Sequence, residues 1–179
     1  TTIAGLAGWE GHVDASGSTA RFRRPMSLVE GLDAALYVAD YTGDTIRRVT
    51  TAGVVTTVAG ADGAHATTGA TGDGTGAAAR FRGPNCIACD GAGNLWVTDR
   101  IKMTIRKIDT DRVVTTVAGF PDAYGHVDDV GSAARFYYPE GICCRGGSVF
   151  VTEGVHVVRE ITEAGVVTTV AGSYNVAGH

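Results

Sequence analysis

The sequence predicts an all-β protein made of repeated antiparallel sheets, and three observations support this prediction. The string Thr-Thr-(Ile/Val)-Ala-Gly begins at Thr1, Thr56, Thr115 and Thr168, a period of 53–59 residues that is typical of repeat proteins. The apolar segments are short and rich in Val, Ile, Thr and aromatic residues, as strands are. The chain also has 26 Gly and 4 Pro among its 179 residues, without a long helical periodicity. We therefore expect helices to be few and short.

Each of the three copies contains the same four strand-forming segments in the same order. The first segment follows a proline, the second ends in an acidic residue, the third carries an arginine, and the fourth is a Val-Thr-Thr-Val run. In the second copy these segments follow Pro84 and lie at 95–99, 105–108 and 113–117. The connections inside a copy are too short for parallel crossovers, so neighbouring strands should be antiparallel.

The second segment indicates how the sheets pack. Residues 36–39 are apolar at consecutive positions, so both faces of this strand should be buried. An antiparallel sheet that is buried on both faces must lie between two similar sheets, and radial stacking of such sheets makes a β-propeller. The sequence therefore predicts one domain with an orphan outer strand at 1–5, three propeller blades at 6–60, 61–119 and 120–172, and a tail at 173–179.

With these features the chain resembles the NHL-repeat family of six-bladed β-propellers. The resemblance is carried by Pro-x-Gly-Ile at 139–142, Gly-Asn-Leu-Trp-Val-Thr-Asp at 93–99 and Ile-Arg-Lys-Ile at 105–108, and it covers nearly the whole chain. It implies that the three copies are half of a six-bladed ring, as in a piece of a longer repeat protein. Two copies of the chain could also complete the ring as a two-fold dimer. Ser27 stands where glycine is usual, which predicts that blade 1 is the least regular.

Composition narrows the classes of function. The net charge of −4 and the pI of about 5.7 argue against a nucleic-acid partner. No run approaches the roughly 18 apolar residues that a membrane span needs, and no segment resembles a targeting signal, so we expect a soluble protein. The compartment is not predicted.

The long loop before each first strand supplies the candidate binding residues. An aspartate lies seven residues before an arginine in every copy, and Gly-His-Val-Asp occurs in two of the loops. One interpretation is structural: aspartate caps a short turn and arginine fixes it. The other is a line of loops on one propeller face that offers these side chains to a partner. The candidates are His12, Asp14, Arg21, Asp73, Arg80, His126, Asp128 and Arg135.

Two further patterns are interpreted as structural. The acidic residue that ends the second segment is followed six or seven residues later by an arginine, as in Asp99 and Arg106, which predicts an ion pair across each hairpin. The cysteines (Cys86, Cys89, Cys143 and Cys144) lie where small apolar residues belong, so we interpret them as packing residues. A second Cys-x-x-Cys is missing, and His12 and His126 belong to blades that are not neighbours. We expect no metal site and no cofactor.

The leading functional hypothesis is a non-enzymatic interaction module that presents loops to a protein or a small ligand. It follows from a symmetric scaffold without an asymmetric catalytic set. A metal-dependent propeller hydrolase or lyase is the first alternative, because some propeller relatives are enzymes of this kind. RNA binding is the second, because the resemblance includes RNA-binding proteins and Arg21 to Arg24 are basic and aromatic.

Overall fold

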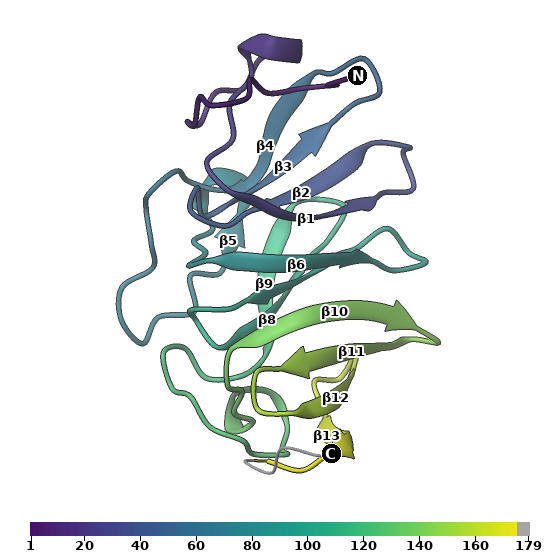
Figure 1. Ribbon diagram of the computed structural model, residues 1–179. Coiled ribbons are helices and arrows are strands. Elements are labelled where there is room, and N and C mark those ends of the chain that lie inside the picture. Colours follow the sequence, from purple (N-terminus) through teal and green to yellow (C-terminus); the bar gives the residue numbers. More distant parts are fainter. Residues whose placement is uncertain (175–179) are drawn as a thin grey trace.

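The computed structural model describes residues 1–174 and contains three antiparallel sheets that follow one another along the chain (Figure 1). Within each blade, strands that are consecutive along the chain are neighbours in the sheet. The blades are β1 (Pro25–Glu30), β2 (Leu36–Asp40), β3 (Thr45–Val49) and β4 (Val55–Gly60); β6 (Pro84–Cys89), β7 (Leu95–Asp99), β8 (Thr104–Ile108) and β9 (Val113–Ala118); and β10 (Pro139–Arg145), β11 (Ser148–Glu153), β12 (Val157–Thr162) and β13 (Val167–Gly172). Of the predicted tail, residues 175–179 lie outside the described residues.

The loops that precede the blades contain the only helices among the described residues. These are three single-turn 3-10 helices, η1 (Gly17–Thr19), η2 (Gly76–Ala78) and η3 (Gly131–Ala133). Each begins with a glycine at a φ of 53–55°, a left-handed conformation that glycine adopts without steric cost. A two-residue strand, β5 (Gly74–Thr75), precedes η2 and pairs with β9. The helices are therefore few and short, as the composition predicts.

The blades stack face to face around two apolar cores. The inner strand β6 lies between β1 and β10, as Figure 1 shows. Phe81 packs in the core between blades 1 and 2, and Phe136 packs in the core between blades 2 and 3; both are fully buried. Burial of one such ring contributes about 1.5–3 kcal/mol to folding. Strands buried on both faces, in sheets that stack radially, confirm the predicted β-propeller architecture with three blades.

The first five residues differ from the expectation. Residues 1–5 form no strand: Ala4 packs on the apolar cluster of blade 1, and no strand of the described residues pairs with the backbone of this segment. They nevertheless keep one contact of an outer strand: Gly5 N–H donates to Gly17 O, as Gly119 N–H donates to Gly131 O at the end of β9. In a ring of two chains, this segment and β13 of the second copy would compete for one position. Self-association therefore stays a prediction, and it requires one of these segments to move.

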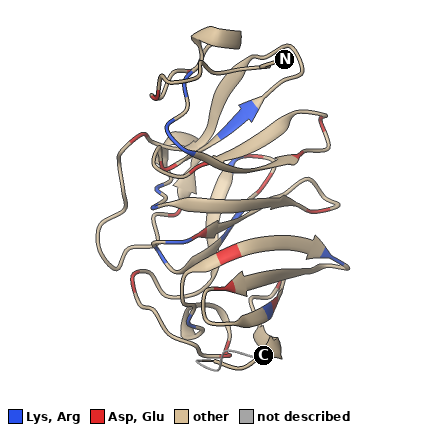
Figure 2. Ribbon diagram, in the orientation of Figure 1, with Lys and Arg blue, Asp and Glu red and all other residues tan. Residues whose placement is uncertain are grey.

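The surface of the arc carries apolar side chains at both ends and mixed charge throughout. Leu28, on the outer face of blade 1, is 60% exposed, and Val170 on β13 is 48% exposed. Figure 2 shows basic and acidic residues interspersed along the arc, without a broad region of one sign in this view. Within residues 1–174, no helix is long and apolar enough to cross a bilayer.

Candidate functional site

Each blade contains one fully buried arginine on its third strand. The guanidinium group of Arg106 lies 3.0 Å from Asp99, which ends β7, and 2.9 Å from Asp73, in the loop before the sheet. It also donates to the carbonyl oxygen of Arg80 at 3.0 Å. We call this arrangement the arginine clamp. Its members are Asp14, Asp40 and Arg47 in blade 1, Asp73, Asp99 and Arg106 in blade 2, and Asp128, Glu153 and Arg159 in blade 3.

The clamp includes the ion pair that the sequence predicts across each hairpin. The pair is short in blades 2 and 3, at 3.0 and 2.7 Å, and longer in blade 1, at 3.8 Å between Arg47 and Asp40. Each guanidinium also lies over a phenylalanine ring, for example Arg106 over Phe81 at 5.0 Å, as cations do over aromatic faces. A buried arginine thus receives charge, hydrogen bonds and an aromatic surface from three segments of one repeat.

Burial and charge act against each other on the clamp carboxylates. Burial raises the pKa of Asp99 to about 6, although the charge of Arg106 opposes this. Burial also raises the pKa of Glu153, against the effect of Arg159. Burial alone would raise the pKa of Asp128 too, but the Thr169 N–H and Arg159 hold it below its usual value. At pH 7 Asp99 and Asp128 are therefore mainly ionised.

The predicted loop aspartates are used inside their own blades. Asp14 accepts hydrogen bonds from Arg47, from Thr57 N–H at 2.9 Å and from the Thr57 hydroxyl at 3.0 Å. Asp128 makes the same contacts with Arg159 and Thr169. These bonds tie the loop to the third and fourth strands, so the aspartates hold the fold together.

The predicted loop arginines close the 3-10 turns. Arg21, Arg80 and Arg135 each donate from Nη1 to the carbonyl oxygen three residues earlier, at 2.6 Å in every blade. This agrees with the structural interpretation, in which the arginine fixes a turn. No hydrogen bond or ion pair among residues 1–174 joins predicted residues of different blades.

The two predicted histidines lie beside the clamps. His12 Nε2 is 3.2 Å from the Thr57 hydroxyl, and His126 lies 3.2 Å from Arg159 and stacks on Tyr174 with ring centroids 5.0 Å apart. Burial and the neighbouring arginine lower the pKa of both histidines. Within the described part of the chain, no three side chains of His, Cys, Asp or Glu are grouped so that they could hold a metal ion.

A cleft lies where the three inner strands begin, and side chains from all three blades meet there. It is open to solvent and has a volume of about 380 Å³. Antiparallel pairing places the turn after the second strand beside the start of the first, as in the pairing of Pro25 with Asp40. The side chains that line this inner-strand cleft are Arg24, Met26, Tyr41, Asn85, Arg100 and Glu140.

The cleft is built from positions at which the three repeats differ. The residue before the proline is Arg24, Gly83 or Tyr138, and the residue after it is Met26, Asn85 or Glu140. The residue after the second strand is Tyr41, Arg100 or Gly154. The clamp residues around these positions recur in every copy, so the cleft is lined by variable side chains that stand beside a recurring frame.

Two arginine–tyrosine pairs frame the cleft. Arg24 lies over the ring of Tyr41 at 5.3 Å, and it is exposed, without an acidic group within 4.0 Å among residues 1–174. Arg100 lies over the ring of Tyr138 at 4.7 Å and is 3.4 Å from Glu140. The cleft therefore has two guanidinium groups and one carboxylate, and one of its cations has no anionic partner there.

Tyr138 adopts an unusual backbone conformation at this cleft. Its φ of 47° lies in the left-handed region, where the equivalent residue of blade 2 is Gly83 with a φ of 72°. A side chain in this region costs about 1–2 kcal/mol. Among residues 1–174, six other non-glycine residues have a positive φ as well, so this conformation alone does not mark the cleft as a site.

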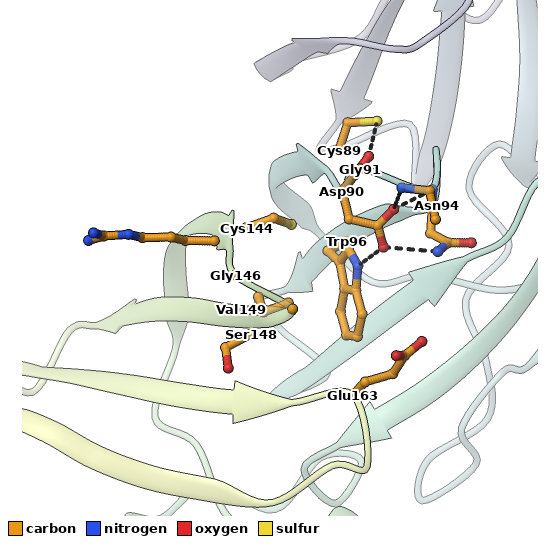
Figure 3. Close-up of a pocket in the computed structure, with 13 residues that line it drawn as sticks. Cys89, Asp90, Gly91, Asn94, Trp96, Cys144, Gly146, Ser148, Val149 and Glu163 are labelled. Atoms are coloured by element: carbon orange, nitrogen blue, oxygen red, sulfur yellow. Dashed lines mark hydrogen bonds between the residues drawn. The ribbon is translucent and has the colours of Figure 1, made fainter.

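A second hollow, of about 350 Å³, lies between blades 2 and 3 at the opposite ends of their inner strands (Figure 3). Its carboxylate, Asp90, accepts hydrogen bonds from Trp96 Nε1 and Asn94 Nδ2 at 2.9 Å, and also from two backbone N–H groups. Burial raises the pKa of the Cys144 thiol to about 12, so this thiol stays neutral. A hollow of about 360 Å³ recurs between blades 1 and 2. These hollows recur between neighbouring blades, and the Asp90 carboxylate of the one in Figure 3 is already engaged.

The cysteines follow the packing interpretation with one difference. Cys86, Cys89 and Cys144 are half-buried between inner strands, but Cys143 is exposed. The difference arises because Ile142 and Cys144 face blade 2, whereas Cys143 lies on the opposite face of blade 3, which no other blade of the described residues covers.

No protein-family model matches the chain, and no curated protein matches it. Solved β-propeller structures do resemble it. A protein of unknown function from Bacteroides thetaiotaomicron is 28% identical with a TM-score of 0.62, and the match covers 78% of this chain and 33% of that one. An auxiliary nutrient binding protein from Bacteroides ovatus is 20% identical, with a TM-score of 0.66 and coverage of 87% and 38%. Virginiamycin B lyase from Staphylococcus aureus is 19% identical, with a TM-score of 0.54 and coverage of 81% and 40%. The chain thus spans between a third and two fifths of the length of these structures.

Proposed function

We propose that this chain is the ligand-binding part of an NHL-like β-propeller, and that its ligand binds in the inner-strand cleft without being chemically changed. The observation that carries the proposal is that side chains from all three blades meet in this cleft at positions where the repeats differ, and that one of them, Arg24, has no acidic partner among the described residues. A symmetric scaffold needs the same residues in every blade for folding, whereas one ligand needs different groups around it. The loop residues predicted from the sequence supply the first set, and the cleft supplies the second.

The size and position of the cleft support this function. Its volume of about 380 Å³ lies at the lower end of the range for small-molecule sites, so the ligand should be small. Its side chains come from three inner strands and the turns beside them, which the clamps hold in place. A nutrient binding protein of similar fold is in keeping with a binding role for this scaffold.

A blocked cleft tests the proposal. Met26 lines the cleft and is 47% exposed, so Met26→Trp should fill part of it without disturbing a core. Leu28→Trp is the matched control, because Leu28 is exposed on the same strand and lies outside the cleft. A library of sugars, nucleosides, amines, carboxylates and short peptides is screened by ligand-observed NMR against both variants and the unchanged protein.

We expect compounds that bind the unchanged protein and Leu28→Trp but not Met26→Trp. If every compound that binds the protein binds Met26→Trp equally well, the ligand lies elsewhere and the proposal is wrong. The proposal is also wrong if the library yields no compound that binds. Thermal unfolding of both variants shows that they are folded.

A further inference from the structure

We infer that the inner-strand cleft recognises a small organic monoanion, a carboxylate that also carries a neighbouring hydrogen-bond donor. This inference rests on the proposed function, because it concerns the ligand of the same cleft. It follows from the charges and from the hydrogen-bonding capacity that remain free in the cleft.

Arg24 is the free cation of the cleft. Its guanidinium group has no acidic partner within 4.0 Å among the described residues, and it lies over the ring of Tyr41. Arg24 N–H donates to Asp40 at 2.6 Å, and Tyr41 N–H donates to Arg24 O at 2.9 Å, so the backbone of this pair is fixed. A guanidinium group with free N–H donors on a fixed backbone suits a carboxylate, whose two oxygens match its fork.

The other charges of the cleft limit the charge of the ligand. Glu140 contributes one negative charge, and Arg100 lies 3.4 Å from it. One positive charge therefore remains, at Arg24, and a ligand with a single negative charge balances it. A dianion such as a phosphate monoester would bring its second charge close to Glu140, and like charges at short range repel.

Two hydrogen-bond acceptors of the cleft also remain free. The Glu140 carboxylate is half-exposed and accepts only the long contact from Arg100 among residues 1–174, so it retains acceptor capacity. Asn85 uses its amide N–H on Glu140 O at 3.3 Å, and its amide oxygen accepts no hydrogen bond from the described part of the chain. Both free acceptors line the cleft, so a ligand hydroxyl or amine beside the carboxylate would satisfy them.

Tyr138 fixes the acceptor side of the cleft. Its ring supports Arg100, which in turn lies beside Glu140, so the strained backbone of Tyr138 determines where these two side chains lie. Tyr138 is therefore a positioning residue. Glycine in its place would remove the ring and relieve the left-handed φ, so binding should weaken without a fall in stability.

Mandelate tests the inference, because it has a carboxylate, a hydroxyl beside it and a ring that fits next to Met26. Mandelamide is the uncharged match, phenylacetate lacks the hydroxyl, and inorganic phosphate is the competing anion. Binding is measured by isothermal titration. We expect mandelate to bind more tightly than each of the other three compounds. Loss of a charged hydrogen bond in Arg24→Gln should weaken mandelate binding by about tenfold or more.

Two further variants separate a binding role from a structural one. Arg145→Gln removes an exposed arginine at the other end of β10 and should leave mandelate binding unchanged. Tyr138→Gly should weaken binding while the thermal midpoint stays equal or rises, whereas a residue needed only for folding would lower both.

The inference is wrong if mandelamide or phosphate binds as well as mandelate, if Arg24→Gln binds mandelate like the unchanged protein, or if mandelate does not bind. These failures differ from failure of the proposed function. If a neutral compound binds the unchanged protein but not Met26→Trp, the cleft is still the binding site, and only the inference that its ligand is an anion is wrong. If no compound loses binding in Met26→Trp, both the proposed function and this inference are wrong.

Discussion

The arginine clamp of blade 2 allows a sharp test of what holds the propeller together. Arg106→Met keeps the length and apolar stem of the side chain and removes its charge. Asp99, which is fully buried, would then keep only the N–H of Arg82 at 2.8 Å, and Asp73 would lose its bond at 2.9 Å. Removal of one partner of a buried ion pair destabilises a protein by about 3–5 kcal/mol, because the other charge stays behind. For a chain of this size, that loss lowers the thermal midpoint by about 6–20 °C.

Urea unfolding at pH 7 and pH 5 checks both the magnitude and its cause. The pKa of Asp99 already lies near 6 in the folded protein, and without Arg106 it should rise further. A carboxyl whose folded pKa exceeds its unfolded pKa binds protons more readily in the folded state, so the stability it contributes falls as the pH rises through that range. The loss caused by Arg106→Met should therefore be smaller at pH 5 than at pH 7.

Arg48→Met is the matched control. Arg48 follows the clamp arginine of blade 1 on β3 and pairs with Asp33 at the surface, where such pairs contribute about 1 kcal/mol or less. A loss below about 1 kcal/mol for Arg106→Met, or a loss that is no smaller at pH 5, would refute the account of the clamp.

Two more predictions concern ionisable groups. Burial and Arg159 lower the pKa of His126, so the unfolded chain takes up its proton first and stability should fall as the pH drops from 7 to 5.5. His126→Gln should reduce this fall in urea midpoints, and an equal fall in both proteins would contradict the expectation. Burial raises the pKa of Cys144 to about 12 and Cys143 is exposed, so iodoacetamide at pH 8 should alkylate Cys143 first. Mass spectrometry that finds Cys144 alkylated as fast would show that the thiol is not shielded.

The repeat made most of the fold predictable from the sequence. Periodicity gives the number of blades, and the acidic residue that ends the second strand and the arginine on the third give the hairpin ion pair, because both lie in one hairpin. The sequence did not show that Asp14 also binds Arg47, which lies 33 residues later along the chain. The repeat pattern does not show which residues of a loop contact a strand that far along the chain. The sequence therefore allowed the interpretation that the aspartates bind a partner.

The inner-strand cleft was missed for a different reason. An alignment of repeats directs attention to residues that recur, such as Pro25 and Arg47, and these build the scaffold. Arg24, Tyr138 and Glu140 flank the recurring prolines and are unlike one another, so they offered no pattern. These residues could have been found by comparing the positions on either side of the recurring prolines, which vary between the repeats. Such a comparison also requires the knowledge that the inner strands converge. That convergence is a property of the fold in three dimensions.

The clamp also determines which stretch of chain behaves as a module. Each buried arginine takes one carboxylate from its own sheet and another from the connection that precedes the sheet, so a sheet removed without that connection would leave its arginine half-neutralised. A module that can be duplicated, deleted or exchanged between propellers therefore begins after the last glycine of one outer strand, as at Gly60, and ends at the equivalent glycine of the next, Gly119. Joints placed there cut no clamp. Duplication of this stretch in a gene would add a blade that contains both carboxylates for its own buried arginine. The residues on either side of its proline and the residue after its second strand could then change without loss of the clamp.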